Sequence, residues 1–304
     1  MRNALLIPLG AGIFSALLHV TVIFGIFSLA PIAATGLSLG FMSGAVAASF
    51  AAIIIAIVST GSGSFSIFVL TSALPTLVAV FFSLQNRPDQ AGNVEWYPLG
   101  RILSWLTALS MVFFITAFFS QMANERGLEA AVERFVISIF GQLPADAPPE
   151  LNDFFALVFK ILPASIAASG ILLVVLNCAL AQRWLLAKGK NIRPKPDYSG
   201  VETMIWPLAT AVIGGILWFT GGNLGYLGLN VLLISAIPFF FIGLAVLHSI
   251  SAAWPGRPFL LAGAYIFLVL AHWPAALLVA LGTLEPWLRL REKANARHSN
   301  KGNE

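Results

Sequence analysis

Polar side chains inside long apolar stretches are the residues of this sequence with the clearest capacity for chemistry. Lys160, Asn230 and His272 each interrupt an apolar run, and Tyr226 and His248 lie near the two ends of the run that contains Asn230. A polar group at membrane depth is costly unless it bonds to another group or lines a cavity. We therefore expect these five residues to be the candidates for binding a ligand.

Each candidate also has a structural interpretation. Lys160 lies near the start of its apolar run, where a long side chain reaches back to the outer interface. Histidine and asparagine side chains more often form hydrogen bonds between helices, worth about 0.6 kcal/mol on average, than they act on a ligand. The sequence leaves both interpretations open.

Recognisable enzyme and metal chemistry is absent from the sequence. His19, Asn177, Asn230, His248 and His272 show no spacing of three or four residues that would place two metal ligands on one helix face. There is no P-loop, no HExxH, no CxxC, no GxSxG and no Rossmann glycine pattern. We expect no enzyme activity, no metal and no cofactor.

Composition places the chain in a lipid bilayer. Hydrophobic residues make up 58% of the 304 residues and charged residues only 10%, with a mean hydropathy of +0.88. A soluble domain carries about 25% charged residues. The apolar runs are unbroken and do not alternate, which predicts membrane helices and not a barrel. The expected fold class is an all-α, polytopic transmembrane helical bundle.

Hydropathy divides the chain into about eight membrane-embedded segments. They cover residues 5–30, 37–59, 65–82, 102–119, 154–186, 205–220, 224–250 and 259–288. The uncharged connections 31–36 and 59–64 are expected to be tight turns between neighbouring helices. We expect one membrane domain over 1–290 and a disordered basic tail over 291–304.

The few charges predict which parts lie on which side. The loop 183–199 and the tail are basic, whereas the segment 120–153 is acidic. The positive-inside rule puts the loop, the tail and the C-terminus in the cytoplasm and the acidic segment outside. Topology explains the basic residues, so we expect no nucleic-acid partner.

Near the C-terminus, the number of apolar blocks disagrees with the topology that the charges predict. Two cytoplasmic basic segments require an even number of crossings, yet three apolar blocks separate them. His272, Trp273 and Pro274 interrupt the last block at its middle. A re-entrant hairpin opening to the cytoplasm resolves the conflict, and a single proline-kinked helix with the tail outside is the alternative.

Two further patterns concern helix packing. Leu128, Val132, Phe135 and Ile139 share one face of a helix predicted over 123–140, which lies either in the outer membrane interface or over the bundle as a loop helix. Small residues recur at four-residue spacing along the second block, at Gly36, Gly40, Gly44 and Ala48. Such a seam serves packing within the bundle or contact with a membrane-protein partner.

The last quarter of the chain resembles the YybS-like family of bacterial membrane proteins, whose function is unknown. The likeness rests on Pro238, the run FFFIGLAVLH with Gly243 and His248, Tyr265, and the ending LGTLEPWLRLR with Gly282, Glu285 and Arg289. The resemblance implies a bacterial cytoplasmic membrane location. That family is distantly similar to the substrate-binding subunits of energy-coupling-factor transporters, which implies a vitamin-like small ligand.

Two functions from different classes follow. A protein that binds or transports a small solute would have a cavity lined by groups such as Asn230, Tyr226 and Lys160. A membrane scaffold or assembly factor for the cell envelope would instead have a filled interior and a partner on the Gly36 to Ala48 seam.

Overall fold

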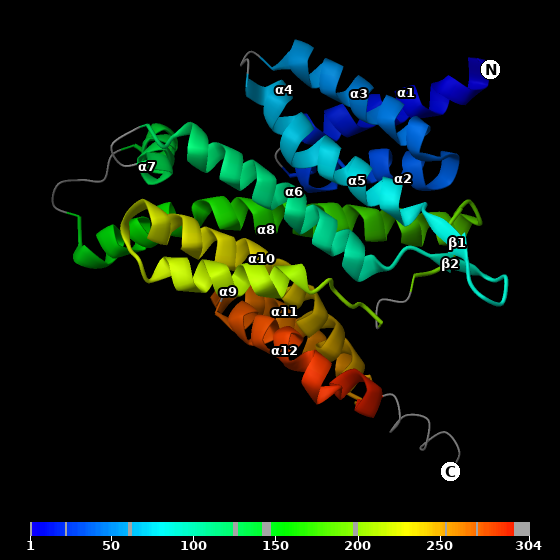
Figure 1. Ribbon diagram of the computed structural model, residues 1–304. Coiled ribbons are helices and arrows are strands. Elements are labelled where there is room, and N and C mark those ends of the chain that lie inside the picture. The colour runs from blue at the N-terminus through cyan, green and yellow to red at the C-terminus, as the bar shows by residue number, and fades with distance from the viewer. Residues whose placement is uncertain are drawn as a thin grey trace. The chain divides into compact units, whose positions relative to one another are not determined.

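The computed structural model describes residues 2–21, 23–59, 63–123, 127–141, 147–196, 200–252, 254–271 and 273–294. These residues are helical almost throughout, which confirms the predicted all-α class (Figure 1). The chain divides into two compact units. Unit 1 comprises Met1–Leu109 and Ala167–Pro196, and unit 2 comprises Ser110–Ile166 and Asp197–Glu304. The single membrane domain expected over 1–290 stays a prediction.

Unit 1 begins with helices that break earlier than the sequence predicts. Helix α1, Arg2–Val20, is followed by a short 3-10 turn at Gly25–Phe27 and by α2, Ala30–Leu39. The first apolar block is therefore not one helix. The turn expected over 31–36 is also wrong, because those residues lie inside α2.

The turn lies instead at Gly40. Its φ of 96° ends α2 and allows α3, Phe41–Val58, to begin at once. Only glycine adopts such a backbone conformation at no steric cost. The proline at position 31 stands in the first turn of α2, where its missing N–H costs nothing.

The third apolar block forms one helical stretch of 21 residues from Gly63 to Ser83. It consists of α4, Gly63–Phe68, a π-helical turn at Val69–Ala73, and α5, Leu74–Ser83. Pro75 has no N–H for the carbonyl of Thr71, and the widened turn lies at this point. Strands β1, Asn86–Pro88, and β2, Val94–Trp96, form an antiparallel hairpin after α5.

Two helices follow the hairpin. Helix α6, Leu99–Ser120, matches the predicted fourth segment closely. Helix α7, Gly127–Phe140, confirms the helix expected in the acidic segment. Leu128 of α7 is buried, but Phe135 and Ile139 of the predicted apolar face are exposed. Both its interfacial and its loop-helix interpretations stay predictions.

Helix α8, Pro149–Lys188, has 40 residues and is by far the longest. At 1.5 Å per residue it is about 60 Å long, twice the thickness of the hydrocarbon core. Helix α9, Trp206–Trp218, is much shorter, because its 13 residues extend only about 20 Å. The sixth apolar block is therefore too short to cross alone.

Unit 2 ends with three helices. Helix α10, Gly222–Ile250, has 29 residues, and α11, Arg257–Ala271, and α12, Pro274–Leu288, have 15 each. The axes of α11 and α12 differ in direction by 118°. That bend is far larger than an ordinary proline kink, so the last block is not a gently kinked helix. Whether the pair re-enters the membrane stays a prediction.

Within the described residues, five helices are long and apolar enough to cross a membrane, or six if α11 and α12 form one broken span. The predicted count of eight is not confirmed. Three shorter apolar helices account for the difference: Leu5–Val20, Gly25–Leu39 and Trp206–Trp218. A multi-pass membrane protein is the class that the structure supports.

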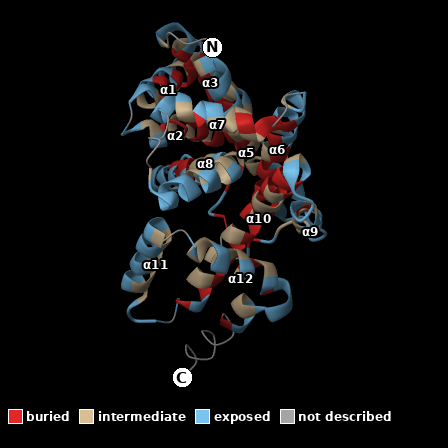
Figure 2. Ribbon diagram, turned by 90° about the vertical axis from the view of Figure 1, so that its left-hand side faces the viewer, coloured by how far each residue is buried: buried red, intermediate tan, exposed pale blue. Residues whose placement is uncertain are grey.

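Glycines set the closest helix contacts of unit 2. A Cβ atom on Gly243 of α10 would collide with the carbonyl of Leu278, and one on Gly282 of α12 would collide with the carbonyl of Phe239. Small residues at such crossings let two backbones approach closely, which replaces the hydrophobic driving force that lipid does not supply. In Figure 2 the buried residues accordingly concentrate along α10, whereas α11 shows none.

The predicted seam serves packing inside unit 1, and it is not a stripe on one helix. Gly36 lies on α2, whereas Gly44 and Ala48 lie on α3, and the turn at Gly40 folds the two helices together. A Cβ atom on Gly44 would lie 2.9 Å from the Cα of Gly36. Gly36, Gly44 and Ala48 are buried by the chain itself.

We predict that Gly243→Ala destabilises the α10–α12 contact, because overpacking costs about 1–3 kcal/mol. Gly263→Ala on α11 is the matched control, since nothing lies within 4 Å of its added methyl group. Thermal unfolding of the detergent-purified protein measures the difference. Equal unfolding temperatures for the two variants would contradict the predicted contact.

Candidate functional site

Pro163 lies inside α8 and opens the hydrogen-bond ladder of that helix. Because proline has no N–H, the carbonyl oxygen of Phe159, four residues earlier, loses its helical donor. In hydrocarbon such a group needs another partner. Two side chains of α10, Tyr226 and Asn230, contact α8 at this point, and both are buried.

The Asn230 amide bonds to the backbone of α8 on both sides of Pro163. Its Oδ1 accepts the N–H of Ala164 at 3.1 Å, and its Nδ2 donates to the carbonyl of Lys160 at 2.9 Å. These two backbone groups pair with each other in a regular helix. Nδ2 also donates to the Tyr226 carbonyl at 3.0 Å, so both amide hydrogens have acceptors.

Tyr226 completes this polar cluster. Its Oη donates to the carbonyl of Phe159 at 3.2 Å, the acceptor that Pro163 leaves without a helical donor. The side chain of Lys160 is exposed, and this residue contributes only its backbone carbonyl to the cluster. The structure therefore brings together three of the five predicted ligand residues, but their contacts replace hydrogen bonds that α8 lacks at Pro163. We assign Asn230 and Tyr226 a structural role.

His248, the fourth candidate, connects α10 to α11. Its Nε2 lies 2.8 Å from the Oη of Tyr265. Beside this pair is a cavity of about 140 Å³ between α10, α11 and α12. Apart from Tyr265, every side chain that lines it is apolar, among them Leu247, Leu268 and Leu278. This cavity has room for a small apolar group.

The fifth candidate, His272, lies outside the described residues. Pro274, two positions later, begins α12 and lines the cavity. Trp273 packs edge-on against Phe267 of α11, with ring centroids 5.4 Å apart. Of the interruption that the sequence singled out in the last apolar block, Pro274 thus lines the cavity and Trp273 packs against Phe267, which also lines it.

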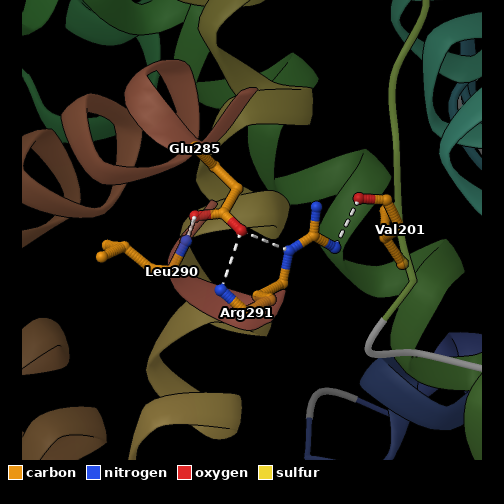
Figure 3. A network of polar contacts seen from close by, with 4 residues as sticks. All are labelled: Val201, Glu285, Leu290 and Arg291. Atoms are coloured by element: carbon orange, nitrogen blue, oxygen red, sulfur yellow. Dashed lines mark hydrogen bonds and ion pairs between the residues drawn. The ribbon is translucent and has the colours of Figure 1, made fainter. Parts of the chain in front are cut away.

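A buried carboxylate closes the end of α12. Oε1 of Glu285 accepts the N–H and the Nε of Arg291, both at 3.0 Å, and its Oε2 accepts the N–H of Leu290 at 3.0 Å (Figure 3). Arg291 also donates to the carbonyl of Val201 at 2.9 Å, which ties the segment before α9 to this turn. The left-handed residue Arg289 ends the helix. The network orders backbone and leaves no open carboxylate.

Asn177 has a comparable role in unit 1. Its Nδ2 donates to the carbonyls of Ile26 and Leu173, both at 2.8 Å, at the break between α1 and α2. The hydroxyl of Ser15 donates to the carbonyl of Ser28 at 2.6 Å in the same break. Polarity alone marked Asn177 in the sequence, and nothing there indicated its partner 151 residues away.

In the described part of the chain, no three His, Cys, Asp or Glu side chains are grouped so that they could hold a metal ion. No family model, no curated protein and no solved structure matches this chain. The resemblance to the YybS-like family therefore stays a prediction.

We predict that Tyr226→Phe destabilises the protein by about 0.6 kcal/mol and at most about 1.7 kcal/mol, the range of single hydrogen bonds in membrane proteins. Pro163→Ala restores an N–H to the Phe159 carbonyl, so Tyr226→Phe should cost much less in that background. A double-mutant cycle of unfolding in detergent measures this coupling.

Tyr265→Phe serves as the control for this cycle, because the Tyr265 hydroxyl bonds to His248 of α10 and its loss should show no coupling to Pro163→Ala. If Tyr226→Phe costs the same with and without Pro163, the repair role assigned to Tyr226 is wrong.

Proposed function

We propose that this chain is a multi-pass membrane protein that binds a small apolar or amphipathic molecule in the cavity between α10, α11 and α12. The supporting observation is an apolar cavity with one polar pair, His248 and Tyr265, beside it. Ligand sites combine an apolar lining with a few polar groups that fix orientation. Transport of the bound molecule is an extension of the same proposal.

Size restricts the ligand. The cavity of about 140 Å³ is close to the roughly 150 Å³ that accommodates benzene. Sites for a whole drug-sized ligand measure about 300–1,000 Å³. The cavity therefore admits one apolar group of a larger molecule, whose polar end would meet His248 and Tyr265. A polar vitamin fits this description less well than an alkyl or isoprenoid chain does.

The packing of α11 supplies the means of entry. No described residue of α11 is buried, whereas α10 has buried residues along its whole length. Elements with few buried contacts open at the lowest free energy. We infer that α11 moves to admit the ligand while α10 and α12 stay joined through Gly243 and Gly282.

A scaffold or assembly factor without a ligand is the second candidate. The observation in its favour concerns Asn230 and Tyr226, which were expected to line a solute cavity. Their side chains instead form hydrogen bonds with the backbone of α8. Both candidates predict a stable bundle, but only the first predicts occupancy of the cavity.

Filling the cavity tests the proposal. Ala264 lines it and Ala262, on the same helix, is exposed and does not, so Ala264→Phe and Ala262→Phe form a matched pair. We expect a long-chain alcohol carrying a photoreactive diazirine to label α10–α12 in the wild type and in Ala262→Phe. Labelling should fall at least about fivefold in Ala264→Phe, since the added ring occupies the space. Peptide mapping by mass spectrometry measures the labelling.

Tyr265→Phe probes the polar pair. It should weaken labelling by the alcohol and leave labelling by a diazirine alkane unchanged, because only the alcohol has a hydroxyl to bond. Equal labelling of Ala264→Phe and Ala262→Phe would reject this cavity as the binding site and favour the scaffold.

A further inference from the structure

The end of unit 1 where α5 and α8 finish and α6 begins is built around a buried arginine. Arg193 is 7% exposed, and its Nη1 donates to the carbonyl of Ser83 at 3.4 Å. Its guanidinium lies 6.0 Å from the centre of the Trp96 ring. Gln182 donates to the Arg193 carbonyl at 2.8 Å. The segment after α8 is thereby folded back against the helix ends, and we call this region the basic end.

A cluster of aromatic rings begins at Phe82 and Tyr97, the sequence neighbours of Ser83 and Trp96. Phe82 stacks on both Tyr97 and Trp105, with ring centroids 5.1 Å and 5.4 Å apart. The indole of Trp105 donates to the Oη of Tyr97 at 2.9 Å. Tryptophan and tyrosine are enriched at the level of the lipid headgroups, where their rings meet acyl chains and their polar atoms meet water. The basic end therefore has the composition of a membrane–water interface.

Positive charge at the basic end is in excess and unneutralised. Five cationic side chains are exposed and have no acidic partner within the described part of the chain: Arg101, Arg183, Lys188, Lys190 and Lys195.

The acidic side chains of the hairpin are already engaged. Glu95 pairs with Arg87 at 2.8 Å. Hydrogen bonds from the backbone and side chain of Asn93 lower the pKa of Asp89 and hold that carboxylate within its own turn. No carboxylate of the described residues therefore neutralises the five exposed cations, which are open to an anionic partner.

We propose that the basic end binds the headgroups of anionic phospholipids in the cytoplasmic leaflet. Clusters of four to eight Lys and Arg residues beside membrane helices attract anionic lipid, and the neighbouring rings place those cations at headgroup depth. The positive-inside rule gives the leaflet. This proposal is independent of the cavity in unit 2.

The test compares two triple variants of the full-length protein with equal loss of charge. Lys188→Gln, Lys190→Gln and Lys195→Gln remove three cations of the basic end. Arg134→Gln, Arg289→Gln and Lys293→Gln remove three exposed cations of unit 2. Native mass spectrometry after incubation with equimolar phosphatidylglycerol and phosphatidylcholine counts the lipids retained by each protein, and size-exclusion chromatography confirms that each is folded.

We expect the wild type and the unit 2 variant to retain phosphatidylglycerol in preference to phosphatidylcholine. In the basic-end variant, the ratio of retained phosphatidylglycerol to phosphatidylcholine should fall at least about tenfold. Equal loss in both variants would show that net charge alone acts and would overturn the proposal. Displacement of phosphatidylglycerol by a short RNA that binds more tightly would also overturn it, in favour of a soluble polyanion.

Discussion

The structure depends on one constraint: within hydrocarbon, every backbone N–H and carbonyl needs a partner inside the protein. An unbroken helix meets it automatically, and this chain contains several helices that are broken. At three places in the described residues buried side chains bond to the irregular backbone. Asn230 and Tyr226 do so beside Pro163, Asn177 does so between α1 and α2, and Glu285 does so after α12. Polar residues at membrane depth here serve chiefly to permit irregular backbone.

This constraint explains what the sequence could predict and what it could not. Helices α6 and α10 follow directly from long apolar runs, and the class of the protein follows from the scarcity of charge. The break between α1 and α2 lies inside a run that is apolar throughout, so hydropathy contains no signal for it. Gly40, which ends α2, looks like one more member of a packing seam until its φ of 96° is known.

The candidate site shows the same limit. Polarity within an apolar run correctly marked Asn230 and Tyr226 as unusual, but a sequence pattern does not distinguish a ligand from a distant backbone group. The partner of the Asn230 amide is Ala164, 66 residues away, and the reason for the contact is the proline beside it. Backbone bonding of this kind is hinted at when one apolar run contains a proline and another contains an asparagine. Only the tertiary contact shows that the two residues belong together.

The same reasoning indicates where a ligand has room. Where α10 meets α12, glycines bring the two backbones into close contact, and where it meets α8, Asn230 and Tyr226 bond to the backbone around Pro163. Helix α11 has no comparable ties: none of its described residues is buried, and its polar link to α10 is the pair of Tyr265 and His248. A cavity persists beneath it because apolar side chains alone, without a close glycine crossing, do not bring two helices into full contact. A molecule that supplies both an apolar group and a hydrogen-bonding group would complete the packing that α11 lacks, and this is the physical basis for proposing binding there and not at the more polar cluster around Asn230.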